Sequence, residues 1–130
     1  KMANECEVAA WLRAAERTNK RYAPVGEFKL ETVTDSLKVL QLTMDSTMGF
    51  FPTKYDIKSP NHVIMKIGKG KWPEYMEKPN LQRTPPMYHA GGAPILQKYL
   101  VNPKVRVTPL RVPPRNEYDD IDCEWELELD

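Results

Sequence analysis

Hydrophobic residues near the N-terminus recur at helical spacing and predict a helix over residues 4–21. Val8, Trp11 and Ala15 fall on one face of this helix, with polar and charged residues between them. Acidic residues stand near its start and basic residues near its end, an order that complements the helix dipole. Asn4 is the expected N-cap. The stripe therefore indicates a helix that buries its apolar face in a core.

The segment after this helix allows two interpretations. Alternating apolar and charged residues predict a strand over 27–33, joined through a turn at 34–36 to a second strand over 37–44. The rival interpretation is a helix over 35–48, because the leucines and methionines of that stretch also stand at helical spacing. We favour the hairpin, since Val39 and two threonines enrich the segment in strand-forming residues.

The middle of the chain predicts short elements separated by turns. Residues 49–60 have the composition of a loop, and the apolar alternation of residues 62–67 predicts a strand. Residues 72–94 contain five prolines and a glycine pair, so we expect an irregular, largely extended segment there. Residues 95–101 could form one or two helical turns.

Two strands are predicted near the C-terminus. Valines alternate with basic residues over 104–107, and apolar residues alternate with glutamates over 123–129. In an antiparallel pair, lysine and arginine would face glutamate across the strands. The last strand pairs either with 104–112 or, by strand addition, with the sheet edge of a neighbouring protein. Pro109 should lie at an edge or a bulge, because it cannot donate to the ladder. The residues expected to make this pairing are Glu124, Trp125, Glu126, Leu127 and Glu128.

These elements predict an α+β fold in which an N-terminal amphipathic helix packs on a small antiparallel sheet. A long proline-rich extended segment and a C-terminal strand follow. The expected parts are a compact α+β head at 1–67, the extended segment at 68–103 and a C-terminal strand pair with an acidic end at 104–130. A chain of 130 residues fits one domain. Its twelve prolines are about twice the usual share, and eleven of them follow residue 50.

Charge is sorted along the chain, although the formal net charge is only +1. Residues 1–53 carry seven basic and seven acidic side chains, and residues 54–115 carry twelve basic and three acidic ones. Residues 116–130 carry eight acidic side chains and no basic one. Either the acidic end folds back onto the basic middle, or each block meets a partner of opposite sign.

No pattern in the chain predicts catalysis or a cofactor. The glycine-lysine run at 68–71 lacks the spacing of a nucleotide-binding loop, and no Gly-x-Ser-x-Gly elbow is present. The residue types that zinc prefers are scattered rather than closely spaced, so no metal site is expected. They are Cys6, His62, His89 and Cys123. The two cysteines are expected to be free thiols.

The basic middle of the chain is the strongest candidate for binding a partner. Basic side chains attract phosphates, and interleaved aromatic rings can stack on exposed bases. The residues predicted to contact a nucleic acid or an acidic protein are Lys66, Lys69, Lys71, Trp72, Arg83, Lys104, Arg106, Arg111 and Arg115.

Together these patterns favour a non-catalytic accessory or structural subunit of a large multiprotein assembly. Its basic, proline-rich segment would bridge neighbouring subunits, and the candidate assemblies are a ribosome, organellar ones included, or a respiratory or ATP-synthase complex. The alternative is a free-standing α+β binding module whose basic face holds RNA or an acidic protein. No apolar run is long enough to span a membrane, and no secretory signal is evident. We expect an intracellular protein, with the mitochondrion as a candidate compartment because position 1 is not Met. No small-molecule substrate is expected.

Overall fold

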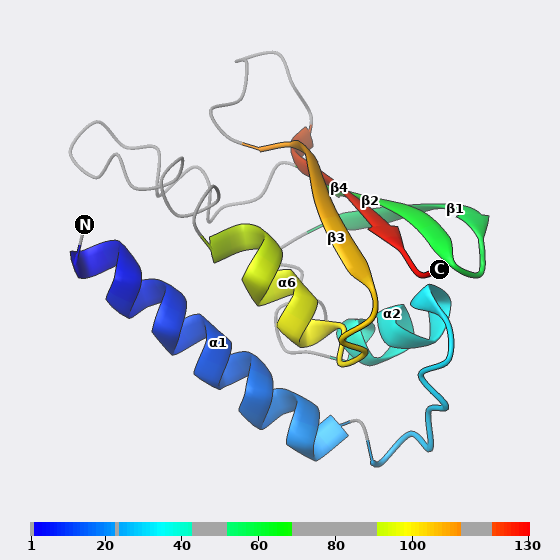
Figure 1. Ribbon diagram of the computed structural model, residues 1–130, viewed down its shortest axis with the longest axis horizontal. Coiled ribbons are helices and arrows are strands. Elements are labelled where there is room, and N and C mark those ends of the chain that lie inside the picture. Colours follow the sequence, from blue (N-terminus) through cyan, green and yellow to red (C-terminus); the bar gives the residue numbers. More distant parts are fainter. Residues whose placement is uncertain (1, 23, 43–51, 69–90, 113–120) are drawn as a thin grey trace.

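The computed structural model has an α+β fold with three helices and a four-stranded antiparallel sheet among its described residues (Figure 1). The described residues are 2–22, 24–42, 52–68, 91–112 and 121–130. The elements in chain order are α1 (Met2–Tyr22), α2 (Val33–Gln41), β1 (Thr53–Ser59), β2 (His62–Gly68), α6 (Ala93–Tyr99), β3 (Arg106–Arg111) and β4 (Ile121–Glu128). The predicted fold class is therefore confirmed as α+β.

The acidic strand β4 lies inside the sheet, whose strand order is β1-β2-β4-β3. It pairs antiparallel with β2 on one side and with β3 on the other. The sequence left open whether this strand pairs within the chain or with a neighbour, and the structure pairs it within the chain. Strands from the predicted head (1–67) and from the predicted C-terminal part (104–130) share this one sheet. The boundaries between the predicted parts stay predictions.

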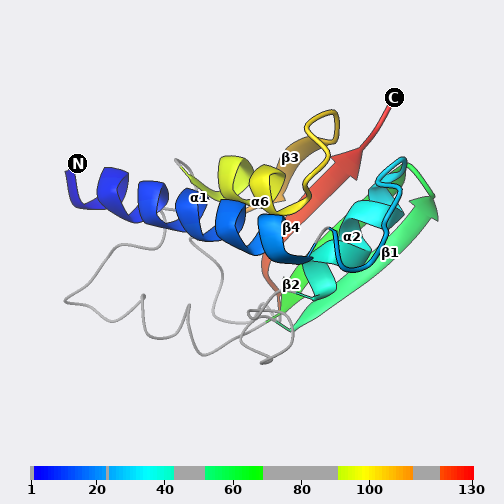
Figure 2. The ribbon, with the colours of Figure 1, turned by 90° about the horizontal axis from the view of Figure 1, so that it is seen from below.

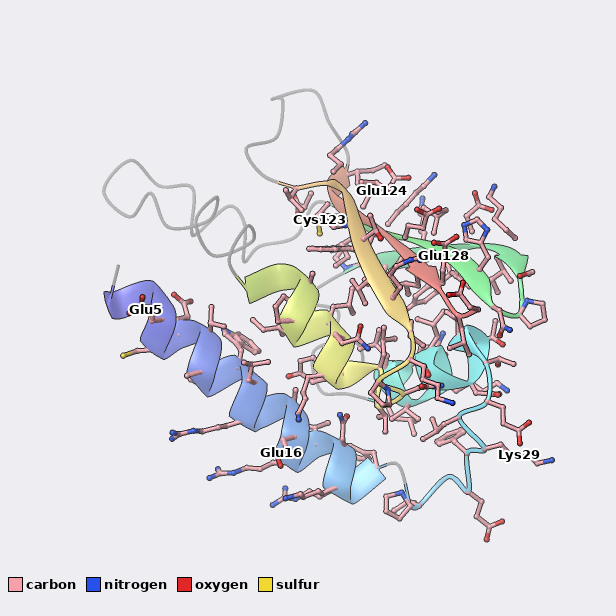
Figure 3. All side chains as sticks on the ribbon, viewed as in Figure 1. Glu5, Glu16, Lys29, Cys123, Glu124 and Glu128 are labelled. Carbon is pink, nitrogen blue, oxygen red and sulfur yellow. The ribbon has the colours of Figure 1, made fainter. Side chains whose placement is uncertain are left out.

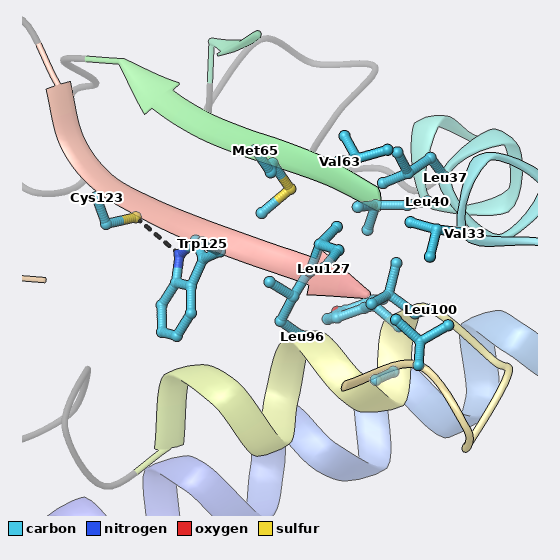
Figure 4. Close-up of a cluster of buried hydrophobic side chains, with 13 residues drawn as sticks. Val33, Leu37, Leu40, Val63, Met65, Leu96, Leu100, Cys123, Trp125 and Leu127 are labelled. Atoms are coloured by element: carbon cyan, nitrogen blue, oxygen red, sulfur yellow. Dashed lines mark hydrogen bonds between the residues drawn. The ribbon is translucent and has the colours of Figure 1, made fainter. Parts of the chain in front are cut away.

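One face of the sheet is covered by helices and carries the hydrophobic core. Figure 4 shows the core side chains between strands β2 and β4 and helices α2 and α6, with α1 beyond α6. Figure 2 gives the same arrangement from a second direction. Burying a large aliphatic side chain contributes about 1.5–3 kcal/mol, so this face provides most of the stability. The buried cluster comprises Ala15, Val33, Leu37, Leu40, Val63, Met65, Leu96, Tyr99, Leu100, Val105, Cys123, Trp125 and Leu127.

The N-terminal helix is confirmed, but its expected position against the sheet needs correction. Helix α1 packs on α6, and α6 in turn packs on β3. The approach of α6 to α1 is close at Gly91, where an added Cβ would lie 2.5 Å from Val8 Cγ2. The helix also begins at Met2, so Asn4 is a helical residue rather than the N-cap.

The predicted hairpin over 27–44 is wrong, because its second half forms helix α2. Thr32 is the N-cap: its Oγ1 accepts a hydrogen bond from the Asp35 N–H (3.1 Å), and the Asp35 carboxylate accepts one from the Thr32 N–H (3.3 Å). This reciprocal capping box starts a helix at the position where we expected a turn. Leu37 and Leu40 are buried on one helical face, so packing outweighs the strand preference of Val39.

The first half of the expected hairpin is not a strand either. Glu27 and Leu30 have φ angles of 48° and 56°, in the left-handed region. An extended strand cannot contain such angles. Despite their alternating sequence, the residues before the N-cap of α2 therefore form an irregular connection.

The loop expected over residues 49–60 is also wrong in part, because residues 53–59 form strand β1. This strand lies at a sheet edge and pairs only with β2, so most of its side chains are exposed. Residues 43–51 lie outside the described part of the chain. The missed signal is the alternation of Tyr55 and Ile57 with charged neighbours, followed by the turn at residues 60–61.

The remaining predicted elements are confirmed where the structure describes them. The strand at 62–67 is β2, the helical turns at 95–101 correspond to α6, and the two C-terminal strands are β3 and β4. Pro109 lies on the edge strand β3, beside a register shift between Pro109 and Arg111. The extended segment predicted over 68–103 is wrong in its last part, because residues 93–99 form helix α6. Residues 69–90 of that segment lie outside the described residues.

Candidate functional site

The face of the sheet opposite the helices carries a row of glutamates from β4 flanked by basic residues from both neighbouring strands. We call these residues the open face. Figure 3 labels Glu124 and Glu128 along β4, among the charged side chains of the adjoining strands. The register places basic side chains or His62 opposite two of the three glutamates. The open face comprises His62, Lys66, Arg106, Glu124, Glu126 and Glu128.

Each glutamate of the open face has a cationic or imidazole partner. Glu124 Oε1 lies 3.7 Å from Lys66 Nζ, and Glu126 Oε1 lies 2.9 Å from His62 Nε2. Glu128 Oε2 accepts a 2.6 Å hydrogen bond from Arg106 Nη2. The basic and acidic blocks of the sequence thus meet across the strands, one pair after another along β4. This pairing accounts for part of the charge sorting.

The Arg106–Glu128 pair keeps both of its members charged. Its hydrogen bond, followed by the charge of Arg106, holds the pKa of Glu128 below its ordinary value. The same hydrogen bond raises the pKa of Arg106, and the charges of Glu128, Asp130 and Glu126 add to that rise. Both side chains are substantially exposed to solvent, so water screens the pair and limits its effect on stability. Its main consequence is the register, because slipping β3 by one residue would separate the charges.

Three metal-ligating groups converge at one end of the open face. One ligand atom each of His62, Glu126 and Glu128 lies within 4.8 Å of the other two. The register brings them together: His62 is the Cα partner of Glu128, and Glu126 is two residues away on the same side of β4. All three side chains are partly buried, which limits their motion but leaves them open to a small ion.

The residues predicted to bind a partner do not act as one group. Lys66 and Arg106 are engaged in ion pairs within the sheet, and Arg111 is the Cα partner of Glu124. Lys104 is exposed in the turn before β3, where its N–H donates to Asn102 Oδ1 (2.9 Å). The other predicted contact residues, Lys69, Lys71, Trp72, Arg83 and Arg115, lie outside the described residues.

The residues predicted to pair the last strand divide between the two faces of the sheet. Trp125 and Leu127 are buried in the core, while the three glutamates lie on the open face. The pairing partner is β3 over residues 106–111, and β2 is a second partner that the sequence did not suggest.

The two cysteines are free and have different environments. Cys6 is exposed on α1, whereas Cys123 is fully buried on β4. Burial raises the pKa of Cys123 to about 12, against the smaller opposite effect of the hydrogen bond donated by Trp125 Nε1. The Cys123 thiol is therefore neutral at physiological pH and is a core residue rather than a nucleophile.

An open groove of about 540 Å³ lies between the connection before α2, the turn before β3 and the end of β4. Asn102 holds two of its walls together, because its Nδ2 donates to the Leu30 carbonyl (2.8 Å). Leu30 and Val101 both line the groove with positive φ. Its ionisable residues, Glu31, Lys104 and Asp130, contain no nucleophile paired with a base.

The outer face of α1 carries a basic row that sequence reasoning missed. Every fourth residue from Glu5 to Arg21 is exposed, and the last three of these are Arg13, Arg17 and Arg21. Lys20, on the neighbouring row, forms an ion pair with Glu16 (3.4 Å). The balanced charge of residues 1–53 hid this row, because most of the acids that cancel it lie on other faces or in other segments. The i, i+4 spacing of the three arginines was the signal available in the sequence.

Comparison with known proteins gives no match: no protein-family model, curated protein or solved structure is similar to this chain. Among the described helices, none combines the length and apolar character needed to cross a membrane.

Proposed function

We propose that this protein is a non-catalytic accessory subunit of a larger assembly and that the outer face of α1 contacts an acidic neighbour. The observation that carries the proposal is the distribution of unpaired basic charge. Lys66 and Arg106 are used inside the sheet, whereas Arg13, Arg17 and Arg21 form no ion pair with another described residue. These three arginines place a row of available basic charge on one helix face, whereas the other exposed basic residues, such as Lys29, Lys54 and Lys104, lie apart from this row.

The geometry of α1 suits such a contact. The three arginines span eight residues of helix, which corresponds to about 12 Å along the axis. Ala15, on the opposite side of α1, is fully buried, so the helix is held by its inner face and its outer face stays accessible. Arginine forks bind phosphate and carboxylate groups in two-point fashion. Either RNA or an acidic protein subunit would supply those groups.

The wider setting of the proposal follows from composition. Of the segment predicted over residues 68–103, only the part before helix α6 would lie extended against neighbouring subunits, since prolines reduce the entropy lost when a segment becomes ordered. The candidate assemblies are a ribosome, organellar ones included, or a respiratory or ATP-synthase complex. An intracellular and in particular a mitochondrial location is part of this proposal.

The alternative function is a free-standing binding module for RNA or an acidic protein. The observation that favours it is the single sheet with its own hydrophobic core, which does not need a partner to bury its apolar face. A free module would be a compact monomer whose affinity for RNA falls steeply as salt rises.

Charge reversal on α1 tests the proposal. The tagged protein, the variant R13E/R17E and the control K29E/K54E would be expressed in the native source and followed by sedimentation and cross-linking mass spectrometry. The control reverses two exposed lysines away from α1. We expect the parent and the control to sediment with a large complex and to cross-link to constant neighbours, and R13E/R17E to move to the monomer fraction.

Two outcomes would count against the proposed subunit. Retention of R13E/R17E in the complex would remove α1 as the contact. Sedimentation of the parent protein as a monomer would favour the free module, and a salt titration of its RNA binding would then decide that alternative.

A further inference from the structure

We propose that His62, Glu126 and Glu128 form a binding site for Zn²⁺ or a similar divalent transition-metal ion. The inference goes beyond the proposed function and does not depend on it. It rests on the convergence of one imidazole and two carboxylates from two adjacent strands, with one ligand atom of each within 4.8 Å of the others.

The ligand set selects the kind of metal. Zinc is bound in proteins by histidine nitrogen and by carboxylate oxygen at about 2.0–2.2 Å, commonly with three protein ligands and one water. Calcium and magnesium prefer ligand sets made of oxygen alone, so an imidazole at the centre of the site disfavours them. The order of affinity among first-row metals further places zinc and copper above manganese and iron.

The local geometry needs only small side-chain movements to enclose an ion. His62 Nε2 and Glu126 Oε1 are 2.9 Å apart, and they would need to separate to about 3.3 Å to become two ligands of one tetrahedral ion. The ion would replace the hydrogen bond that these atoms share. Glu128 must approach by rotation of its side chain, and its backbone is fixed by ladder pairing with both β2 and β3.

Arg106 orients the third ligand. Its Nη2 holds Glu128 Oε2 at 2.6 Å, so the second oxygen of that carboxylate is not used by this pair. Hydrogen bonds of this kind commonly fix the carboxylates that ligate metals. Arg106 also brings a positive charge, which opposes a cation, but the nearby carboxylates outnumber it. Those that act on Arg106 are Glu128, Asp130 and Glu126.

The site lies at the ends of β2 and β4, next to buried core residues. Val63 and Leu127, the sequence neighbours of His62 and of both glutamates, are fully buried. Their packing keeps β2 and β4 in register, so the three ligands are presented by a rigid backbone. A bound ion would join the two central strands on the open face, as the core joins them on the other face.

Zinc binding by the full chain tests the site. The background is C6S/H89Q, which removes an exposed thiol and the only other histidine. Isothermal titration with zinc chloride should show one saturable site per chain, and magnesium should not compete. His62→Gln should weaken zinc binding about tenfold or more. Glu124→Gln is the matched control on the same strand and face, and it should leave the affinity within about twofold.

A second measurement keeps the test decisive if His62→Gln alters the fold. Substoichiometric Cu²⁺ added to the isotope-labelled C6S/H89Q protein should broaden the amide signals of residues 62 and 126–128 before others. The proposal is overturned if zinc uptake shows no saturation up to about 1 mM zinc, because a dissociation constant above that value indicates only weak binding. Equal zinc binding by a folded His62→Gln variant, or broadening centred elsewhere, would also overturn it.

Discussion

The two faces of the sheet use the same strand for different purposes. On β4, Cys123, Trp125 and Leu127 point into a core covered by helices, while the alternating glutamates lie on the open face beside basic partners. The covered face excludes water and provides stability, whereas the open face stays partly exposed and its ion pairs are screened. The comparison teaches that the glutamates of β4 specify the strand register through their partners. The apolar residues of β4 provide the burial energy that stabilises the sheet.

Truncation on the covered face should have the largest effect. Leu127→Ala removes a fully buried side chain from the centre of the cluster and should lower the free energy of unfolding by about 2–5 kcal/mol. Glu124→Gln, three residues away on the open face, should cost less than about 1 kcal/mol. Urea unfolding followed by Trp fluorescence measures both. Similar losses in the two variants would erase the distinction between the faces.

Charge reversal along the open face should have the next largest effect. In E124K/E126K/E128K, the lysines at 124 and 128 would face Lys66 and Arg106, so repulsion replaces attraction at these two pairs, and the change at 126 removes the hydrogen bond with His62. We expect a clear fall in the thermal midpoint. The control E5K/E27K/E31K changes the net charge equally at three exposed positions outside the sheet that form no ion pair with another described residue, and it should change the midpoint much less. An equal fall in the control would show that net charge, not cross-strand position, matters.

The cap of α2 should make a smaller contribution to the covered face. Thr32→Ala should cost about 1 kcal/mol in chemical denaturation, because it removes the N-cap oxygen. Hydrogen bonds from Lys38 and then Thr32 hold the pKa of Asp35 below its ordinary value. The stability that the Asp35 carboxylate contributes is fully present at pH values above the unfolded carboxyl pKa of about 3.9. It is lost as the pH falls through the lower pKa of Asp35 in the folded protein. In Asp35→Asn, the free energy of unfolding should therefore fall less steeply as the pH is lowered through the acid range. An unchanged pH dependence of stability would contradict this role of Asp35.

Thiol labelling should distinguish the buried covered face of the sheet from the exposed surface of α1. Cys6 is exposed and should react with a thiol reagent in the folded protein, whereas Cys123 is buried with a pKa raised to about 12. We expect one equivalent of rapid labelling in buffer and a second only after unfolding. Rapid labelling of both in the folded protein would show that the core around Cys123 is open.

The sequence predicted the elements whose patterns were long or strictly alternating. These are α1, β2 and β4, and for β3 even the edge position of Pro109 was foreseen. Helix α2 was missed because the strand preference of Val39 and the threonines decided for a hairpin, and the Thr32–Asp35 capping box was not considered. The edge strand β1 was missed because few of its side chains are buried. In both cases the deciding interaction is either a cap or a partner strand, which composition does not reveal.

The candidate site could be predicted only in part. Glutamate and basic residues were expected to face each other, but β2 as the second neighbour of β4 was not. His62 and the pair Glu126 and Glu128 are separated by more than sixty positions in the sequence, so only the strand order brings them together. The arginine row on α1 was visible as helical spacing, yet the net charge of its segment concealed it.

Hydrogen exchange of the isolated protein tests most directly the claim that the acidic strand is an internal strand of this fold. The account predicts that amides of β4 and β2 are the slowest to exchange, because both strands have a neighbour on each side. The edge strands β1 and β3 should exchange faster. The contradicting result would be that the Trp125 and Leu127 amides exchange at the rate of an unfolded peptide while α1 stays protected. The acidic end would then not be an internal strand of this fold.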